Sequence, residues 1–342
     1  MTKAERGQWT RHLIREQGAV WEAAAAQVGP LPAGPVLLAG SGSSYYVALT
    51  AAAVARRLGL SVSARPAGDI VTEPEVALSG QRALVVVSRS GHTSEAVWAA
   101  EAAQQRGLAV VALTCHSGAA LTRHADVVWA AEDAEDATVV MIRSFTTLLV
   151  MLQAAVARTA RLDMAPLSDA ASAWSDWRDS NALGWLDAPA GGAPIPRRAV
   201  MLGGGIRLGV AWEGMLKATE MSNQVAHAYA PLEYRHGPWG SLAEEDVVFV
   251  LAQRATAAHD RQLVVDLCQR TPLVVAVGPE GWDAGQVPAT VRLLSYPAAV
   301  DDRWAGPLVA APLQAFSWWW AMASGRDPDA PESLTSVVKL DA

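Results

Sequence analysis

Residues 36–45 read VLLAGSGSSY, and residues 83–93 read ALVVVSRSGHT. In both stretches a short apolar run ends in a segment rich in glycine and serine, and a helical pattern follows, over 45–58 and 93–106. Apolar runs without polar alternation are typical of parallel strands that helices cover on both faces. The two stretches therefore predict βαβ units and an α/β fold.

The same alternation continues outward from these stretches. In the first half we expect further strands at 109–113 and 127–130 and a closing helix at 145–157. The second half starts again with an apolar run at 199–202, which ends in three glycines and precedes a helix. Its expected elements are the helix at 208–222, strands at 247–252, 273–277 and 291–294, and a helix at 257–268. This weak internal repeat predicts two copies of one doubly wound architecture, flavodoxin-like or Rossmann-like, each a parallel sheet flanked by helices.

The length of 342 residues suits two domains rather than one. The expected segments are a helical lead-in at 1–20, a first domain at 21–178, a linker at 179–196, a second domain at 197–328 and a C-terminal tail at 329–342. The linker is placed where glycine and proline interrupt the pattern, Gly191 and Gly192 among them.

The composition excludes several classes of protein. Hydrophobic residues make up 51% of the chain and charged residues 18%, so it is not a disordered protein. A formal net charge of −7 argues against a nucleic-acid binder. The two cysteines, Cys115 and Cys268, form no CxxC motif, which excludes a disulfide framework and favours the reducing cytoplasm.

Two segments bear on membrane targeting. The first 17 residues are rich in charge, so they do not predict a signal peptide. Residues 304–325 carry no charge and are long enough to cross a bilayer, but they include Pro307, Pro312 and Gln314. We expect a buried helix there and no membrane partner.

Small hydroxyl side chains crowd the ends of the first two expected strands, at residues 40–44 and 88–93. Ligands bind at the carboxyl ends of parallel strands, where glycine allows close approach and the next helix offers free N–H groups to an anion. The two loops together predict a phosphate site, while either loop alone is also explained as an ordinary helix cap. No GxxxxGK[ST] motif is present, and Tyr45 stands where a dinucleotide motif has its third glycine.

In the second half, Glu213, Lys217 and Glu220 share one helix face through their spacing. Lysine occurs at only two other positions, Lys3 and Lys339. This row of three charged residues is explained either as an ion pair on a solvated helix face or as fixed charges that face a sugar. His236 precedes Gly237-Pro238 in a loop that can present an imidazole for proton transfer, although a loop histidine often has no such role. No metal-ligand spacing occurs, so no metal and no cofactor are expected.

Residues 42–45 and 88–93 resemble the phosphosugar-binding signature of sugar isomerase (SIS) domains. Residues 213–220 and 235–238 resemble the second domain of double-SIS enzymes. The likeness extends from about residue 10 to 338 and is strongest to the isomerase half of glucosamine-6-phosphate synthase and to the tagatose-6-phosphate isomerase (galactosamine-6-phosphate deaminase) type. It implies two tandem SIS domains.

The resemblance also implies roles for single residues. The phosphate would be bound by Ser44, Ser88, Arg89, Ser90 and Thr93, with Ser41, Gly42 and Ser43 lining the same loop. Ser336 in the C-terminal tail would belong to the same substrate-binding site. Glu220 would carry the proton between C1 and C2 of the sugar. His236 would open the ring, and in relatives this histidine comes from the neighbouring subunit of a homodimer. Glu213 and Lys217 would be supporting polar groups.

Two departures from the synthase bear on the reaction. The chain shows no glutamine-hydrolysing domain, and no cysteine precedes Cys115. The lysine that forms a Schiff base in the synthase tail is replaced by Ser336, with Lys339 three residues further on. We therefore expect a phosphosugar isomerase or deaminase acting on glucosamine or galactosamine 6-phosphate. The alternatives are a deglycase of phosphorylated sugar–amine adducts and a non-catalytic sugar-phosphate sensor.

Overall fold

The computed structural model describes residues 6–189, 194–332 and 334–340. The start of the predicted lead-in, Gly191 and Gly192 of the predicted linker and the last two residues of the predicted tail lie outside the described residues. The chain divides into two compact units, which are described separately. Unit 1 comprises the described residues of 1–15 and 169–332, and unit 2 those of 16–168 and 333–342.

Unit 2 contains a parallel five-stranded sheet with the order β2-β1-β3-β4-β5. Its strands are β1 (Val36–Gly40), β2 (Val62–Pro66), β3 (Ala83–Val87), β4 (Ala109–Thr114) and β5 (Val127–Ala130). The order reverses between β1 and β3, and such a reversal is where doubly wound sheets bind their ligands. The predicted phosphate loops are the two segments that follow these two strands.

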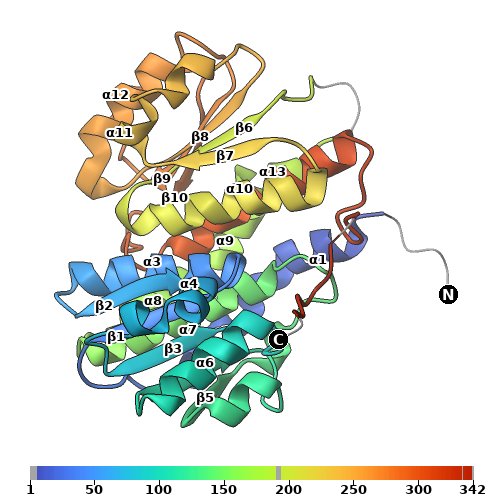
Figure 1. Ribbon diagram of the computed structural model, residues 1–342. Helices are drawn as coiled ribbons and strands as arrows, with labels where there is room; N and C mark the ends of the chain where they lie inside the picture. The colour runs from blue at the N-terminus through green and yellow to red at the C-terminus, as the bar shows by residue number, and fades with distance from the viewer. Residues whose placement is uncertain (1–5, 190–193, 333, 341–342) are drawn as a thin grey trace. The chain divides into compact units, whose positions relative to one another are not determined.

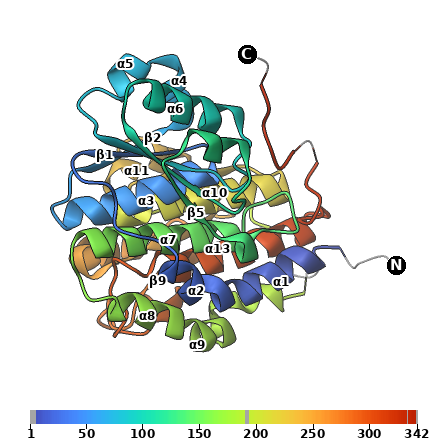
Figure 2. The ribbon, with the colours of Figure 1, turned by 90° about the horizontal axis from the view of Figure 1, so that it is seen from below.

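Helices cover both faces of this sheet. Alternate side chains of β1, β3 and β4, such as Leu37, Leu84 and Val110, pack in one core with alanines of α6 (Ser94–Gln105). On the other face, α3 (Ser43–Arg57) lies beside α7 (Arg143–Thr159), as Figure 2 shows. The remaining helical segments are η1 (Gln17–Val20), α2 (Trp21–Ala26), α4 (Ala67–Thr72), α5 (Pro74–Ala77), η2 (Ala120–His124), η3 (Glu132–Ala134) and α8 (Ala165–Ser172), which runs across the boundary between the units.

Unit 1 contains a second parallel five-stranded sheet with the order β10-β9-β8-β6-β7. Its strands are β6 (Ala199–Leu202), β7 (Ala226–Tyr229), β8 (Val247–Leu251), β9 (Val274–Pro279) and β10 (Arg292–Tyr296). Counted from its own first strand, this sheet has the order 2-1-3-4-5, as the first one has. The fold class predicted from the sequence, two copies of a doubly wound α/β architecture, is thereby confirmed.

The helix that carries the predicted proton-transfer residue is α10 (Leu208–Ser222), and it packs along α13 (Gly306–Ala323) (Figure 1). Gly214 allows this close approach, because a Cβ atom at that position would lie 2.6 Å from Leu313 Cδ1. The other helical segments of unit 1 are α1 (Gln8–Glu16), α9 (Trp174–Asp179), η4 (Asn181–Leu186), η5 (Gly205–Arg207), α11 (Pro231–Tyr234), η6 (Pro238–Ser241), η7 (Arg254–Thr256) and α12 (Ala257–Leu267).

The apolar segment at 304–325 forms α13, whose first sixteen residues are all buried. This confirms the buried helix expected from its prolines and polar residues. Within the described ranges, no helix is long and apolar enough to cross a membrane.

The structure differs from the sequence expectation in two strands and one loop. Strands β2 and β7 are not predicted from the sequence, because polar residues such as Arg65 and His227 interrupt their apolar character. The stretch 179–196 was predicted as a linker. It includes the 3-10 helix η4, where Leu183 and Trp185 are buried, and its described residues lie within unit 1.

Candidate functional site

The first predicted phosphate loop joins β1 to α3 in unit 2. Gly40 must lack a side chain, because a Cβ atom there would lie 2.5 Å from the main-chain carbon of Ser44. Gly42 has a φ of 55°, in the left-handed region that glycine adopts without strain. Ser43 and Ser44 then form the first turn of α3 and are buried at the carboxyl end of the sheet. The loop is therefore built on close backbone approach, as the sequence pattern predicts.

The second predicted loop joins β3 to α6 at the neighbouring strand end, since β1 pairs with β3. Gly91 has a φ of 62° and its N–H donates to Ser88 Oγ at 3.2 Å. The His92 N–H donates to Ser90 Oγ at 3.1 Å, and both serines are buried. Thr93 is the residue before α6, without a side-chain cap bond. The structure thus places hydroxyls and a helix start from both loops at one edge of the sheet.

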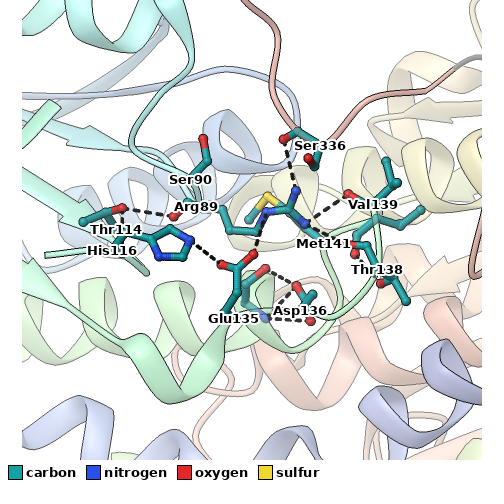
Figure 3. A network of polar contacts seen from close by, with 12 residues as sticks. Arg89, Ser90, Thr114, His116, Glu135, Asp136, Thr138, Val139, Met141 and Ser336 are labelled. Atoms are coloured by element: carbon teal, nitrogen blue, oxygen red, sulfur yellow. Dashed lines mark hydrogen bonds and ion pairs between the residues drawn. The ribbon is translucent and has the colours of Figure 1, made fainter. Parts of the chain in front are cut away.

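Arg89 lies in this loop, but its guanidinium points at main-chain oxygens (Figure 3). Its Nη1 donates to the carbonyls of Thr138 at 3.3 Å and Val139 at 3.0 Å. Its Nη2 donates to the carbonyl of Ser336 at 3.1 Å. The side chain is 5% exposed. The resemblance implied a direct phosphate contact for this residue; the structure shows it joined to three carbonyl groups.

A cavity of about 490 Å³ lies beside Arg89 and Ser90. Its other lining residues come from the same loop after β3, from the loops after β4 and β5 and from the C-terminal segment: His92, His116, Ser117, Gly118, Ala119, Glu132, Glu135, Ser336 and Val337. Glu135 Oε2 lies 3.1 Å from His116 Nε2, and Glu135 Oε1 lies 3.9 Å from Arg89 Nε. Burial raises the pKa of Glu135, against the opposite effect of Arg89 and His116. Sequence reasoning did not single out Glu135 or His116, which belong to no motif.

The C-terminal segment lies against the β3 loop and α6. Besides the Ser336 carbonyl bound by Arg89, the Val338 carbonyl accepts from the Ser94 N–H at 3.2 Å. The Leu340 N–H donates to Ser94 Oγ at 2.9 Å. Ser336, the residue that stands in place of the synthase lysine, is thus brought next to Arg89 and Ser90 within unit 2.

In unit 1, the charged row on α10 is buried. Glu213 and Lys217 are each 1% exposed, while Glu220 is 22% exposed. Lys217 Nζ lies 3.4 Å from Glu213 Oε1 and donates a short hydrogen bond to Glu220. Burial by itself would lower the pKa of Lys217, but the two carboxylates outweigh it and raise the pKa, so the ammonium stays charged. The alternative of a solvated ion pair on an exposed face is therefore wrong.

His236 lies in unit 1 in the turn after α11. Its N–H donates to the Glu233 carbonyl, and Gly237, with a φ of 138°, redirects the chain immediately after it. The side chain is exposed, as expected for a presented imidazole. The role of His236 stays a prediction.

Metal binding finds no support among the residues that the structure describes, because no group of three or more His, Cys, Asp or Glu side chains could hold an ion. Glu132, Glu135 and His116 line one cavity, but Glu132 accepts instead from the Ser117 hydroxyl at 2.5 Å.

Comparison with known proteins gives one family and several relatives. Residues 32–158 match the SIS domain. The chain is 32% identical over 306 residues to a Streptomyces coelicolor protein named provisionally as the D-galactosamine-6-phosphate deaminase AgaS, covering 81% of this chain and 78% of that protein. It is 30% identical over 336 residues to the isomerizing glutamine–fructose-6-phosphate aminotransferase of Pyrobaculum aerophilum, covering 91% of this chain. The match spans 52%, about half, of that aminotransferase.

A similar fold occurs in the crystal structure of glucosamine-6-phosphate deaminase from Thermotoga maritima. The TM-score is 0.82 at 23% sequence identity, and the match covers 97% of this chain and all of that one. At this level of identity the likeness extends to the fold alone. It agrees with the two five-stranded parallel sheets described above.

Proposed function

Since this chain belongs to the SIS-domain family, we propose that it is an enzyme that isomerises or deaminates an aminosugar 6-phosphate. Its matched relatives bear the names of a galactosamine-6-phosphate deaminase and of a fructose-6-phosphate aminotransferase. The observation that carries the proposal is the row on α10. A buried ammonium holds two carboxylates, and only that of Glu220 reaches solvent to a useful extent.

The proposed reaction needs one base that moves a proton between adjacent carbons. Aldose–ketose conversion passes through an enediol or, for an aminosugar, an enolamine. We assign the proton transfer to Glu220, whose carboxylate is oriented by Lys217, and the opening of the ring to His236. General acid–base groups of this kind contribute about 10²–10⁴-fold each.

The phosphate would be bound by the loops of unit 2. Ser44, Ser88, Ser90 and Thr93 offer hydroxyls, and the loop backbone and the start of α6 offer dipoles of the sign that favours an anion. Binding energy from the phosphate, which does not react, orients the open-chain sugar for the proton transfer.

The test is ammonia release from glucosamine 6-phosphate and, separately, from galactosamine 6-phosphate. The wild-type protein should release ammonia from one of them, which also identifies the epimer. Glu220→Gln should lower turnover by about 10²-fold or more while sugar-phosphate binding persists. Normal turnover by Glu220→Gln would contradict the assignment of the proton transfer to Glu220. Binding without conversion would favour a sensor, and release of an amino acid from a phosphorylated sugar adduct would favour a deglycase.

We further propose a cytoplasmic homodimer in which His236 acts on the neighbouring subunit's substrate. The support is the resemblance that implies this arrangement and the two cysteines, Cys115 and Cys268, which are both free. Mixing inactive Glu220→Gln and His236→Gln proteins should restore activity, because a mixed dimer contains one site with both groups intact. A fully active monomer in sedimentation would contradict the dimer.

A further inference from the structure

Arg89 is a buried cation that joins three parts of unit 2. Its guanidinium connects the loop after β3 to the segment before α7, through the carbonyls of Thr138 and Val139. It connects the same loop to the C-terminal segment through the carbonyl of Ser336. A guanidinium has five N–H donors in a fixed plane, so carbonyl contacts at both terminal nitrogens hold that plane in one orientation.

Glu135 is the carboxylate within ion-pair distance of Arg89 among the described residues, at 3.9 Å from Nε. Its second oxygen lies 3.1 Å from His116 Nε2, so both oxygens face a partner (Figure 3). The other charged side chains nearby form hydrogen bonds with main-chain groups. Asp136 accepts from the N–H groups at the start of α7, and Arg143 donates to the Glu135 carbonyl.

A buried cation without a nearby counter-charge lowers the stability of the folded protein. The orientation of the Arg89 guanidinium should therefore depend on the nearby carboxylate of Glu135. We propose that Glu135 is a positioning residue, which holds the Arg89 guanidinium as a clamp on the main chain of residues 138–139 and 336 beside the phosphate loop. This inference rests on the proposed function for its effect on turnover. It assigns Arg89 to the main chain that surrounds the site rather than to the phosphate itself.

The cavity offers a matched pair of variants, Glu135→Gln and Glu132→Gln. Each removes one negative charge from the lining of the same cavity, which by electrostatics alone favours an anion bound nearby. Glu132 accepts from the N–H and the hydroxyl of Ser117, so its variant is the control for the change of charge. A decrease in kcat that occurs in Glu135→Gln and not in Glu132→Gln therefore shows that the clamp has been lost.

The first readout is steady-state kinetics. Glu135→Gln should lower kcat by about 10- to 100-fold, the scale of a displacement of about 1 Å at a reacting site. Glu132→Gln should retain the wild-type kcat and bind sugar phosphate at least as tightly. If Arg89 contacted the phosphate directly, Glu135→Gln would free the guanidinium, tighten phosphate binding and keep kcat. That result would overturn the proposal.

The second readout does not depend on turnover. Hydrogen exchange at the Ser94 and Leu340 amides reports whether the C-terminal segment stays in place, since these N–H groups bond to Val338 and Ser94. Both amides should exchange at least about 10-fold faster in Glu135→Gln than in Glu132→Gln or the wild-type protein, since such local openings occur at low free-energy cost. Unchanged exchange in Glu135→Gln would overturn the clamp. An inactive wild-type protein would instead overturn the proposed function and leave this readout intact.

Discussion

At the scale of single residues, the candidate site depends on charges that the fold keeps from water. The chain contains three lysines, and Lys217 is 1% exposed between two glutamates. Its position in a row with Glu213 and Glu220 was predictable from their spacing on a helix. Its burial was not, because a helix face with charges at this spacing is equally suited to water.

Lys217→Met tests this buried pair. The change leaves the Glu213 carboxylate in the interior without its cation, so we expect a loss of about 3–5 kcal/mol in the free energy of unfolding. Urea denaturation measures the loss. Glu220→Gln is the control, since it keeps Lys217 and Glu213 together and changes only the partly exposed partner. An equal effect of the two variants would contradict the importance of the buried pair.

At the scale of elements, ion pairs connect the residues that precede two neighbouring strands, β6 and β8. Asp246 comes directly before β8, and its side chain is fully buried. It accepts from Arg197 at 3.1 Å and from Arg198 at 2.6 Å, the two residues before β6, and from the Ala243 N–H at 2.9 Å. Burial by itself would raise the pKa of Asp246, but these bonds outweigh it and lower the pKa.

The lowered pKa of Asp246 predicts a pH dependence of stability. An acid whose pKa is lower in the folded protein adds stability above its unfolded pKa of about 3.9, and that stability is lost as the pH falls through the folded value. The difference in unfolding free energy between wild-type protein and Asp246→Asn should therefore be full near pH 6 and shrink below about pH 4. Urea denaturation at several pH values measures it. A difference that grows in acid would contradict this linkage.

The elements themselves were predictable where they are covered on both faces. The continuous apolar runs of β1, β3, β4, β6 and β8 lie inside their sheets, and the sequence marks them clearly. The edge strands β5 and β10 also keep enough apolar residues to be predicted from the sequence. The β2 sequence VSARP and the β7 sequence AHAY are not predicted, because polar and small residues interrupt their apolar character.

At the scale of the whole molecule, the chain passes between the two units three times, since residues 1–15 belong with 169–332 and the C-terminal residues with 16–168. Helix α1 has no acidic residue in its own first turn. Asp329 supplies the missing charge, because its carboxylate accepts from the N–H groups of Trp9 at 3.0 Å and Thr10 at 2.7 Å. A residue 319 positions away thus caps the first helix.

Asp329→Ala should lower the stability of unit 1 by about 1 kcal/mol, the usual cost of a lost helix cap. A thermal unfolding curve measures the change as a lower Tm. The control is Glu332→Ala, which removes an exposed ion pair with Arg326 and should change stability by no more than about 0.5 kcal/mol. Equal curves for Asp329→Ala and wild type would show that the cap contributes nothing.

The sequence by itself determined the α/β class, the repeat of two doubly wound sheets and the loops at residues 40–44 and 88–93. Each of these depends on neighbouring residues: continuous apolar runs, and glycines at points where the backbone must turn or approach closely. Only the tertiary structure decided that Lys217 is buried, that Arg89 binds the carbonyls of residues 138, 139 and 336, and that Asp329 caps α1. The contacts of Arg89 and Asp329 join segments up to 320 residues apart. Sequence patterns carry no signal for the contacts of Arg89 and Asp329, because a hydrogen bond to a main-chain carbonyl or N–H group leaves the identity of that main-chain residue free. The burial of Lys217 depends on which elements pack over its helix face, and the spacing of charges on that face does not determine this.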